Sequence, residues 1–177
     1  MLGVPGPGRP HWLVSPMSVV VGIDPSLTAT GLAAPGGCIT ITTKAGDPRR
    51  LQVIHDAVFA AIDGADLAVI EDLPTHAHGA GLTGMAQGVI RLACLRADVP
   101  FATVPAATLK KFATGSGNAG KADMRMELYK RTGLDLRDDN QVDALWLRQV
   151  GLHLTDHPDA IALPKTHTDA LTKVKTP

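Results

Sequence analysis

The stretch Val19–Gly31, VVVGIDPSLTATG, constrains the fold of this chain more than any other. Its opening valines predict a buried strand, and that strand ends on a lone carboxylate, Asp24. Pro25 and a hydroxyl-rich turn follow. A charge at the tip of a buried strand is costly unless a cation or hydrogen bonds meet it. Asp24 is therefore either a cap for its own turn or a ligand, and this stretch alone leaves both open.

The segments that follow predict an α/β domain with a mixed sheet. Residues 31–34 and 38–43 flank Pro35-Gly36-Gly37, which is typical of a β-hairpin, so the first three strands should form an antiparallel meander. Strands and helices then alternate, which adds two parallel strands and gives a five-stranded sheet flanked by helices. The later elements are expected as a helix from 47 to 63, a strand over 66–71, a helix over 85–97, a strand over 100–104, and helices over 105–113, 121–132 and 138–154.

One domain accounts for the chain of 177 residues. Residues 1–17 are predicted to be a disordered extension without the apolar core of a signal peptide. The folded domain is expected over 18–155 and a polar tail over 156–177, whose docking the sequence leaves open. No apolar run reaches membrane-spanning length. Cys38 and Cys94 form no metal or redox spacing, which favours free thiols in a reducing compartment and hence a cytoplasmic location.

Carboxylates recur at positions where a purely structural role is hard to defend. Glu71 ends a second apolar strand, as Asp24 ends the first, and in open α/β sheets ligands bind at the carboxyl ends of strands. In RDDNQVDALWL, Asp139 and Asp143 lie one turn apart on the helix face that carries apolar residues. In a purely structural interpretation, Asp138 and Asp139 are the N-cap and a first-turn acid of the helix, where the helix dipole favours negative charge. That interpretation does not explain Asp143, which lies inside the helix.

An all-oxygen ligand set of this kind points to Mg²⁺ or Mn²⁺ rather than to zinc. Two such ions bridged by carboxylates suit cleavage of a phosphodiester by direct attack of water, with no covalent intermediate. We therefore expect about two ions at one site.

A second candidate site is a basic, glycine-rich segment between Pro105 and Gly133. Because the formal net charge of the chain is zero, nucleic-acid binding would have to come from such a local patch. The glycines of TGSGNAG allow backbone N–H groups to approach a phosphate. The alternative is a solvated helix face with ordinary ion pairs. The predicted DNA contacts are Lys110, Lys111, Thr114, Ser116, Asn118, Lys121 and Arg125.

These motifs together resemble the RuvC family of Holliday-junction resolvases, which has an RNase H-like fold. The similarity rests on GIDPSLTATG, on the strand ending in Glu71, on DNQVDAL, and above all on VPAATLKKFATGSGNAGKADM. It runs from Val19 to about Leu152. The resemblance implies a homodimer that binds a four-way DNA junction and nicks two strands symmetrically with divalent metal. It also implies catalytic roles for Asp24, Glu71 and Asp143, and it places Lys110 and Lys121 in register with the basic residues of the family. Within the basic segment we predict that Lys121 lies nearest the scissile phosphate and acts in catalysis by stabilising developing negative charge.

The sequence departs from the family at two places. The family's fourth metal position, an Asp or His, is Asn140 here. The helical face favours Asp139 for that role and motif register favours Asn140; we predict Asp139 as a further catalytic, metal-binding residue. After Glu71 the family's aromatic is missing, and His76 and His78 are either base-stacking residues or solvated loop residues.

Other functions remain compatible with parts of the sequence. An actin-like or sugar-kinase ATPase shares a loop like GIDPSLTATG, but this chain is too short and has no Walker loop. An RNase H-like nuclease acting on flaps, forks or hybrids, and a non-catalytic DNA-binding module on the same fold, are the remaining alternatives. The apolar face of the helix over 85–97 is either core or a twofold interface.

Overall fold

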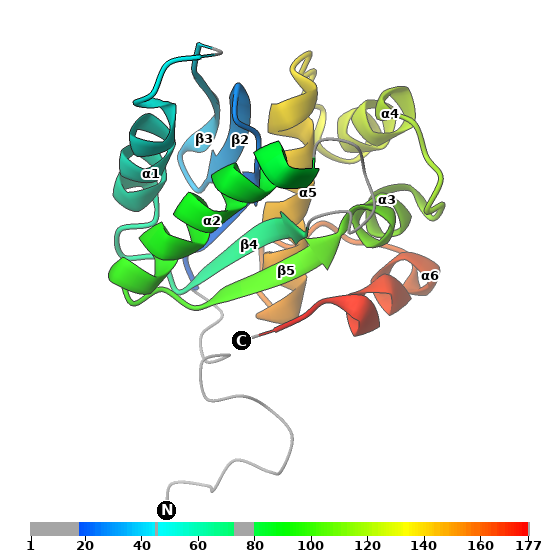
Figure 1. Ribbon diagram of the computed structural model, residues 1–177. Coiled ribbons are helices and arrows are strands. Elements are labelled where there is room, and N and C mark those ends of the chain that lie inside the picture. The colour runs from blue at the N-terminus through cyan, green and yellow to red at the C-terminus, as the bar shows by residue number, and fades with distance from the viewer. Residues whose placement is uncertain (1–17, 45, 73–79, 177) are drawn as a thin grey trace, which may run out of the picture.

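A computed structural model describes residues 18–44, 46–72 and 80–176 of the chain. They form a five-stranded mixed sheet with strand order β3-β2-β1-β4-β5 (Figure 1). β1 (Val20–Asp24), β2 (Ala29–Ala34) and β3 (Gly37–Thr42) pair antiparallel. β4 (Leu67–Asp72) pairs parallel with β1, and β5 (Phe101–Pro105) pairs parallel with β4. The predicted mixed sheet, a meander followed by parallel strands, is confirmed.

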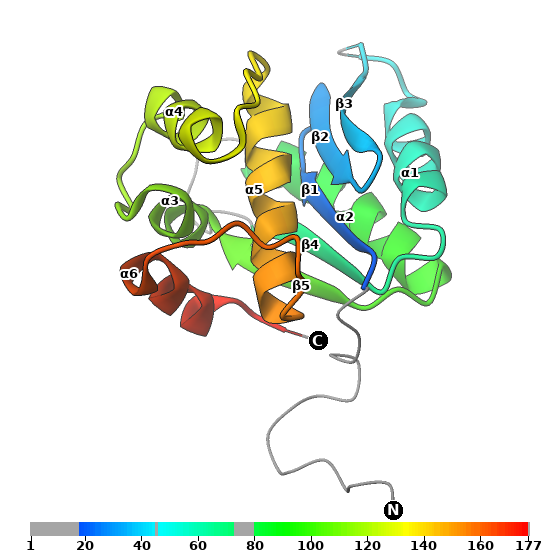
Figure 2. The ribbon, with the colours of Figure 1, turned by 180° about the vertical axis from the view of Figure 1, so that it is seen from behind.

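Helices cover both faces of the sheet, as the front and rear views show (Figures 1 and 2). α1 (Arg50–Ala61) and α2 (Ala80–Arg96) lie on one face. On the other, α5 (Asp139–Leu154) crosses the strands, and α3 (Ala106–Thr114), α4 (Lys121–Thr132) and α6 (Lys165–Thr168) lie beside it. A 3₁₀ turn, η1 (Asp169–Lys173), follows α6. α2 starts about five residues earlier than its apolar pattern indicated, whereas α4 matches its predicted bounds.

Alternation along the strands divides the core into two clusters. Val20 faces the α5 side, and Val21 and Ile23 face the α1–α2 side. Leu67 and Ile70 of β4 divide in the same way. Because both faces are covered, these strands are apolar throughout, and charge first appears where they end.

Glycines allow α5 to lie unusually close to the sheet. A Cβ on Gly22 would lie 2.1 Å from the Ala144 carbonyl oxygen, and one on Gly31 would lie 2.1 Å from that of Asn140. Neither distance is compatible with a side chain larger than hydrogen. The two glycines therefore set the depth of α5, and with it the distance from the acids of α5 to the tip of β1.

The segment after α5 packs back onto the domain. Ile161, Leu163, Leu171 and Val174 contact the α5-side core, and Ala170 is buried. Lys175 makes two backbone hydrogen bonds to Thr103 at the outer edge of β5, of 2.8 and 2.9 Å. The part of the chain that the structure describes contains no helix with both the length and the hydropathy needed to cross a bilayer.

Candidate active site

Two parallel strands bring the first two predicted acids together. β1 and β4 pair in register up to Ile23 and Ile70, so the next residue of each strand is a carboxylate, Asp24 or Glu71. A side-chain hydrogen bond joins these carboxyls. Asp24 is only 9% exposed. Two carboxyl groups in contact require a shared proton or a cation, because two bare negative charges would repel each other.

The third acid comes from α5. Asp143 lies one residue before Ala144, whose carbonyl approaches Gly22 of β1. Its negative charge raises the pKa of both Asp24 and Glu71. The structure thus brings the three acids of the sequence prediction into one electrostatic group, although they lie on three separate elements.

Burial is the main cause of the perturbed acidities in this group. Desolvation, reinforced by Glu71 and Asp143, raises the pKa of Asp24 far above its usual range. Desolvation and then Asp143 raise the pKa of Glu71. Desolvation raises the pKa of Asp143 to about 6, against the opposing charge of Lys121. Such clustered perturbation is characteristic of sites where acids hold a cation or move a proton.

Asp139 is held by the basic residues of α4. Its oxygens accept from Lys121 at 3.1 Å and from Arg125 at 2.7 Å. Partial burial acts in the opposite sense, but these hydrogen bonds keep the pKa of Asp139 below its usual range. The bond to Asp139 in turn raises the pKa of Lys121. The negative charges of Asp143 and Asp24 also raise the pKa of Lys121, so this lysine is within electrostatic range of the three-acid group as well as in contact with Asp139.

Position 140 lies close to the tip of β1. The Asn140 backbone packs against Gly31, the register partner of Asp24. Its amide Nδ2 and its backbone N–H donate to Asp138 at 2.8 and 2.9 Å. Asp138 is the N-cap of α5, which confirms the structural interpretation of that residue, and it also accepts from Thr40 at 2.5 Å.

The basic segment borders the acids through two of its lysines. Lys110 of α3 lowers the pKa of Glu71 and Asp143 by its charge, as Lys121 does for Asp24 and Asp143. Of the other predicted DNA contacts, Lys111, Ser116 and Asn118 are exposed. Thr114 instead donates to the Lys110 carbonyl at 2.9 Å, a hydrogen bond within the last turn of α3. Arg125 is engaged by Asp139 and by the Arg137 carbonyl.

Gln87 is a supporting residue that the sequence analysis missed. It is 3% exposed on the sheet-facing side of α2, and its Nε2 donates to the Glu71 carbonyl at 2.8 Å. A polar side chain within an apolar helix face was the available signal. His76 and His78 lie outside the described residues.

Comparisons with known proteins identify one family over most of the chain. The family model for "Crossover junction endodeoxyribonuclease RuvC" matches residues 20–167. The protein of that name from Rhodopirellula baltica is 32% identical over 160 residues, which cover 80% of this chain and 89% of the relative. The one from Salinibacter ruber is 32% identical over 119 residues, covering 58% and 66%.

Two solved structures share the fold. "T. thermophilus RuvC in complex with Holliday junction substrate" aligns with a TM-score of 0.68 at 21% identity, covering 90% of this chain and 99% of that one. A second Thermus thermophilus RuvC structure gives a TM-score of 0.67 at the same identity. The RNase H-like fold predicted from the sequence is thereby confirmed.

Proposed function

Because this chain belongs to the RuvC family of crossover junction endodeoxyribonucleases, we propose that it resolves four-way DNA junctions by cutting phosphodiester bonds with residues of the three-acid group. The chain is a nuclease with a divalent-metal-dependent chemistry, as its family is. The observation that carries the assignment to this site is the burial of Asp24, Glu71 and Asp143 together beside two lysines. A purely structural cluster would not need three acids with raised pKa values.

We infer that Asp24, Glu71 and Asp143 hold Mg²⁺ or Mn²⁺, with about two ions per site. The donors are all oxygens, which suits a hard cation. Among the described residues no three acidic, histidine or cysteine side chains are already grouped for a single ion, so side-chain rotation would accompany binding to all three. The bound ions would supply an activated water and neutralise charge on the leaving 3′ oxygen.

We expect the fourth metal-binding oxygen to come from Asp139 or Asn140. Asp139, our choice from the helical face, has its oxygens engaged by Lys121 and Arg125. The Asn140 backbone lies beside Gly31 at the tip of β1, and its Nδ2 donates to Asp138, so Oδ1 is the side-chain oxygen that it would offer to a cation. These contacts support Asn140 as a neutral ligand and give Asp139 the role of orienting Lys121. Lys121, so oriented, would stabilise the negative charge that develops on the scissile phosphate.

DNA binding is assigned to α3, the following glycine loop and the start of α4. Lys110, Lys111 and Lys121 supply charge, and exposed Ser116 and Asn118 supply neutral donors. Contacts of this kind position a phosphate backbone and read little sequence. We therefore expect recognition of the junction to rest on its shape and backbone.

Symmetrical cutting requires two copies of the site, and α2 offers a surface for a homodimer. It exposes four large apolar side chains: Leu82 at 57%, Met85 at 44%, Leu92 at 42% and Leu95 at 69%. Repeated exposure of this kind on one helix is costly in water and is typical of an interface. We propose that a second copy covers α2 through a twofold contact.

The test uses a synthetic four-way junction and a linear duplex of the same sequence, each with Mg²⁺, Mn²⁺ or EDTA. Paired nicks in the junction alone, lost in EDTA and in Asp143→Asn, are expected. Equal cutting of both substrates would favour a nuclease of other specificity. Binding of the junction without any cutting under every metal condition would favour the non-catalytic DNA-binding module.

A further inference from the structure

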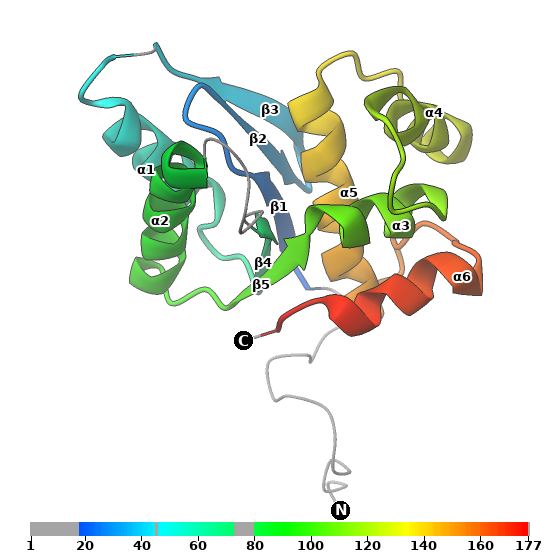
Figure 3. The same ribbon diagram turned by 45° about the vertical axis from the view of Figure 1, so that its right-hand side comes forward.

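The end of the chain is anchored to the elements assigned to DNA binding. α6 lies beside α3 (Figure 3). Just before α6, the Ala162 carbonyl accepts from Arg131 of α4 at 3.3 Å, and Arg131 also pairs with Glu127 at 3.1 Å. Residues that are distant in sequence therefore contact α3 and α4 and restrain their positions.

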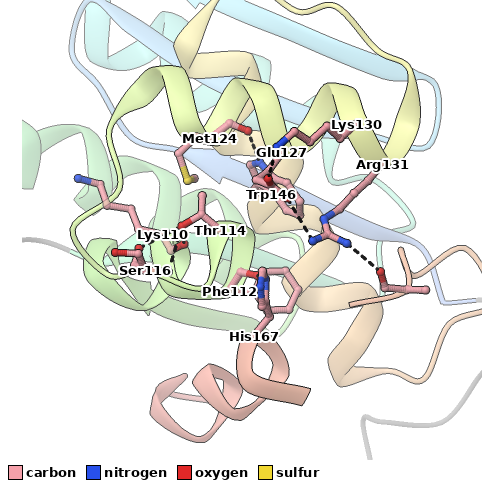
Figure 4. A network of polar contacts seen from close by, with 11 residues as sticks. Lys110, Phe112, Thr114, Ser116, Met124, Glu127, Lys130, Arg131, Trp146 and His167 are labelled. Carbon is pink, nitrogen blue, oxygen red and sulfur yellow. Dashed lines mark hydrogen bonds and ion pairs between the residues drawn. The ribbon is translucent and has the colours of Figure 1, made fainter. Parts of the chain in front are cut away.

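His167 of α6 contacts α3 directly (Figure 4). Its Nδ1 lies 2.9 Å from the Phe112 carbonyl oxygen, and because a carbonyl only accepts, Nδ1 carries the proton and donates. Phe112 is among the last residues of α3, whose carbonyls have no partner within the helix. His167 is 8% exposed, so this bond is shielded from water.

The opposite edge of the imidazole faces the residue where the loop begins. A Cβ on Gly115 would lie 2.9 Å from His167 Nε2, so the ring occupies the space that a side chain there would need. Gly115 has a φ of +82° and ends α3 in the left-handed conformation. The loop over 115–120 leaves α3 at this residue and leads directly to Lys121. One ring therefore contacts both the last turn of α3 and the start of the loop.

We propose that His167 is a positioning residue for junction binding, acting through the Phe112 carbonyl and Gly115 to fix the direction in which the glycine loop leaves α3. This inference rests on the proposed role of that loop in DNA contact. Loss of the imidazole frees the loop without touching Asp24, Glu71 or Asp143, which lie on other elements, and Lys121 after the loop is still held by Asp139 of α5. Substrate binding should therefore weaken while the rate of the bound complex is retained.

His153 supplies a matched control. Its Nε2 also hydrogen-bonds a carbonyl, that of Ile161 at 2.9 Å, and its ring packs edge-on against Phe112 at 5.2 Å. His153→Ala therefore removes a comparable hydrogen bond and ring from the same region without touching the start of the loop. A general loss of packing would affect both variants alike.

The experiment compares the wild-type protein with His167→Ala, His167→Asn and His153→Ala. For each we would measure unfolding, junction KM and kcat, junction Kd in EDTA, and amide hydrogen exchange over 115–118. His167→Ala should raise KM and Kd roughly fivefold, the factor that one neutral hydrogen bond represents. It should speed exchange in the loop and leave kcat within about twofold. His167→Asn, whose amide can still donate to the Phe112 carbonyl, should recover most of the binding.

Equal KM, Kd and loop exchange in His167→Ala and His153→Ala would overturn the positioning role. If His167→Ala does not fold, Gly115→Ala gives a second route, because its Cβ displaces the ring; unchanged binding in that variant would also overturn the role. Failure of the wild type to cut the junction would refute the proposed function instead, and loop exchange and Kd would still decide the role of His167.

Discussion

Replacing Asp143 with Asn should stabilise the metal-free protein while abolishing cleavage. Burial raises the pKa of Asp143 from 3.8 to about 6, so the folded state holds its proton more tightly than the unfolded chain does. The stabilisation from that proton is complete below pH 3.8 and is lost as pH rises through about 6. At pH 8 the folded wild type thus carries a desolvated charge that Asp143→Asn lacks.

The size of the effect follows from the shift. About two pKa units correspond to about 3 kcal/mol, at 1.36 kcal/mol per unit. Because the new amide is itself desolvated, we expect a net gain of about 1–2 kcal/mol, or about 2–8 °C in Tm for a domain of this size. Removing the charge also relieves Asp24 and Glu71, whose pKa values Asp143 raises, and so acts in the same direction.

The assay is thermal unfolding in EDTA at pH 5 and pH 8. The Tm difference between Asp143→Asn and the wild type should be several degrees at pH 8 and roughly half as large at pH 5, where folded Asp143 is still mostly protonated but the unfolded carboxyl is already ionised. Asp63→Asn, at an exposed position, serves as the control and should shift Tm little at either pH. A destabilised Asp143→Asn at pH 8, or a gain that does not depend on pH, would refute the argument that desolvation dominates at this site.

Three further substitutions test the rest of the site. Lys121→Ala should lower kcat by about 10- to 100-fold and junction affinity much less; equal losses in the two quantities would reduce Lys121 to a docking residue. Asp139→Asn should lower kcat but add little to Lys121→Ala in the double variant if it acts through that lysine, whereas a rise in the Mg²⁺ concentration needed would identify a metal ligand. Gly22→Ala should lower the free energy of unfolding by about 3 kcal/mol or more in chemical unfolding, because its Cβ would meet the Ala144 backbone. Gly36→Ala is the control and should not destabilise the fold, because the space around Gly36 is open. A mild effect at Gly22 would show that α5 can move away from the sheet.

The fold and the three acids that the structure groups together could both be predicted from the sequence. Strand periodicity, the Pro-Gly-Gly hairpin and the helical spacing specify local structure, which depends on neighbours within a few residues. Asp24 and Glu71 could be found because a carboxylate that ends an apolar strand is rare without a partner. Asp143 could be found because helix-start chemistry does not extend to the middle of a helix.

Other features depend on contacts between segments distant in sequence. The pairing of Asp139 with Lys121 and Arg125 joins α5 to α4, and neither local pattern specifies the distance between those helices. Likewise Gln87 and His167 are single polar residues whose carbonyl partners lie 16 and 55 residues away. A hydrogen bond to a backbone carbonyl leaves no signature in the residue that accepts it, since every residue has one. Sequence by itself therefore determined which acids are candidates for the chemistry, and the tertiary structure decided which groups contact and support them.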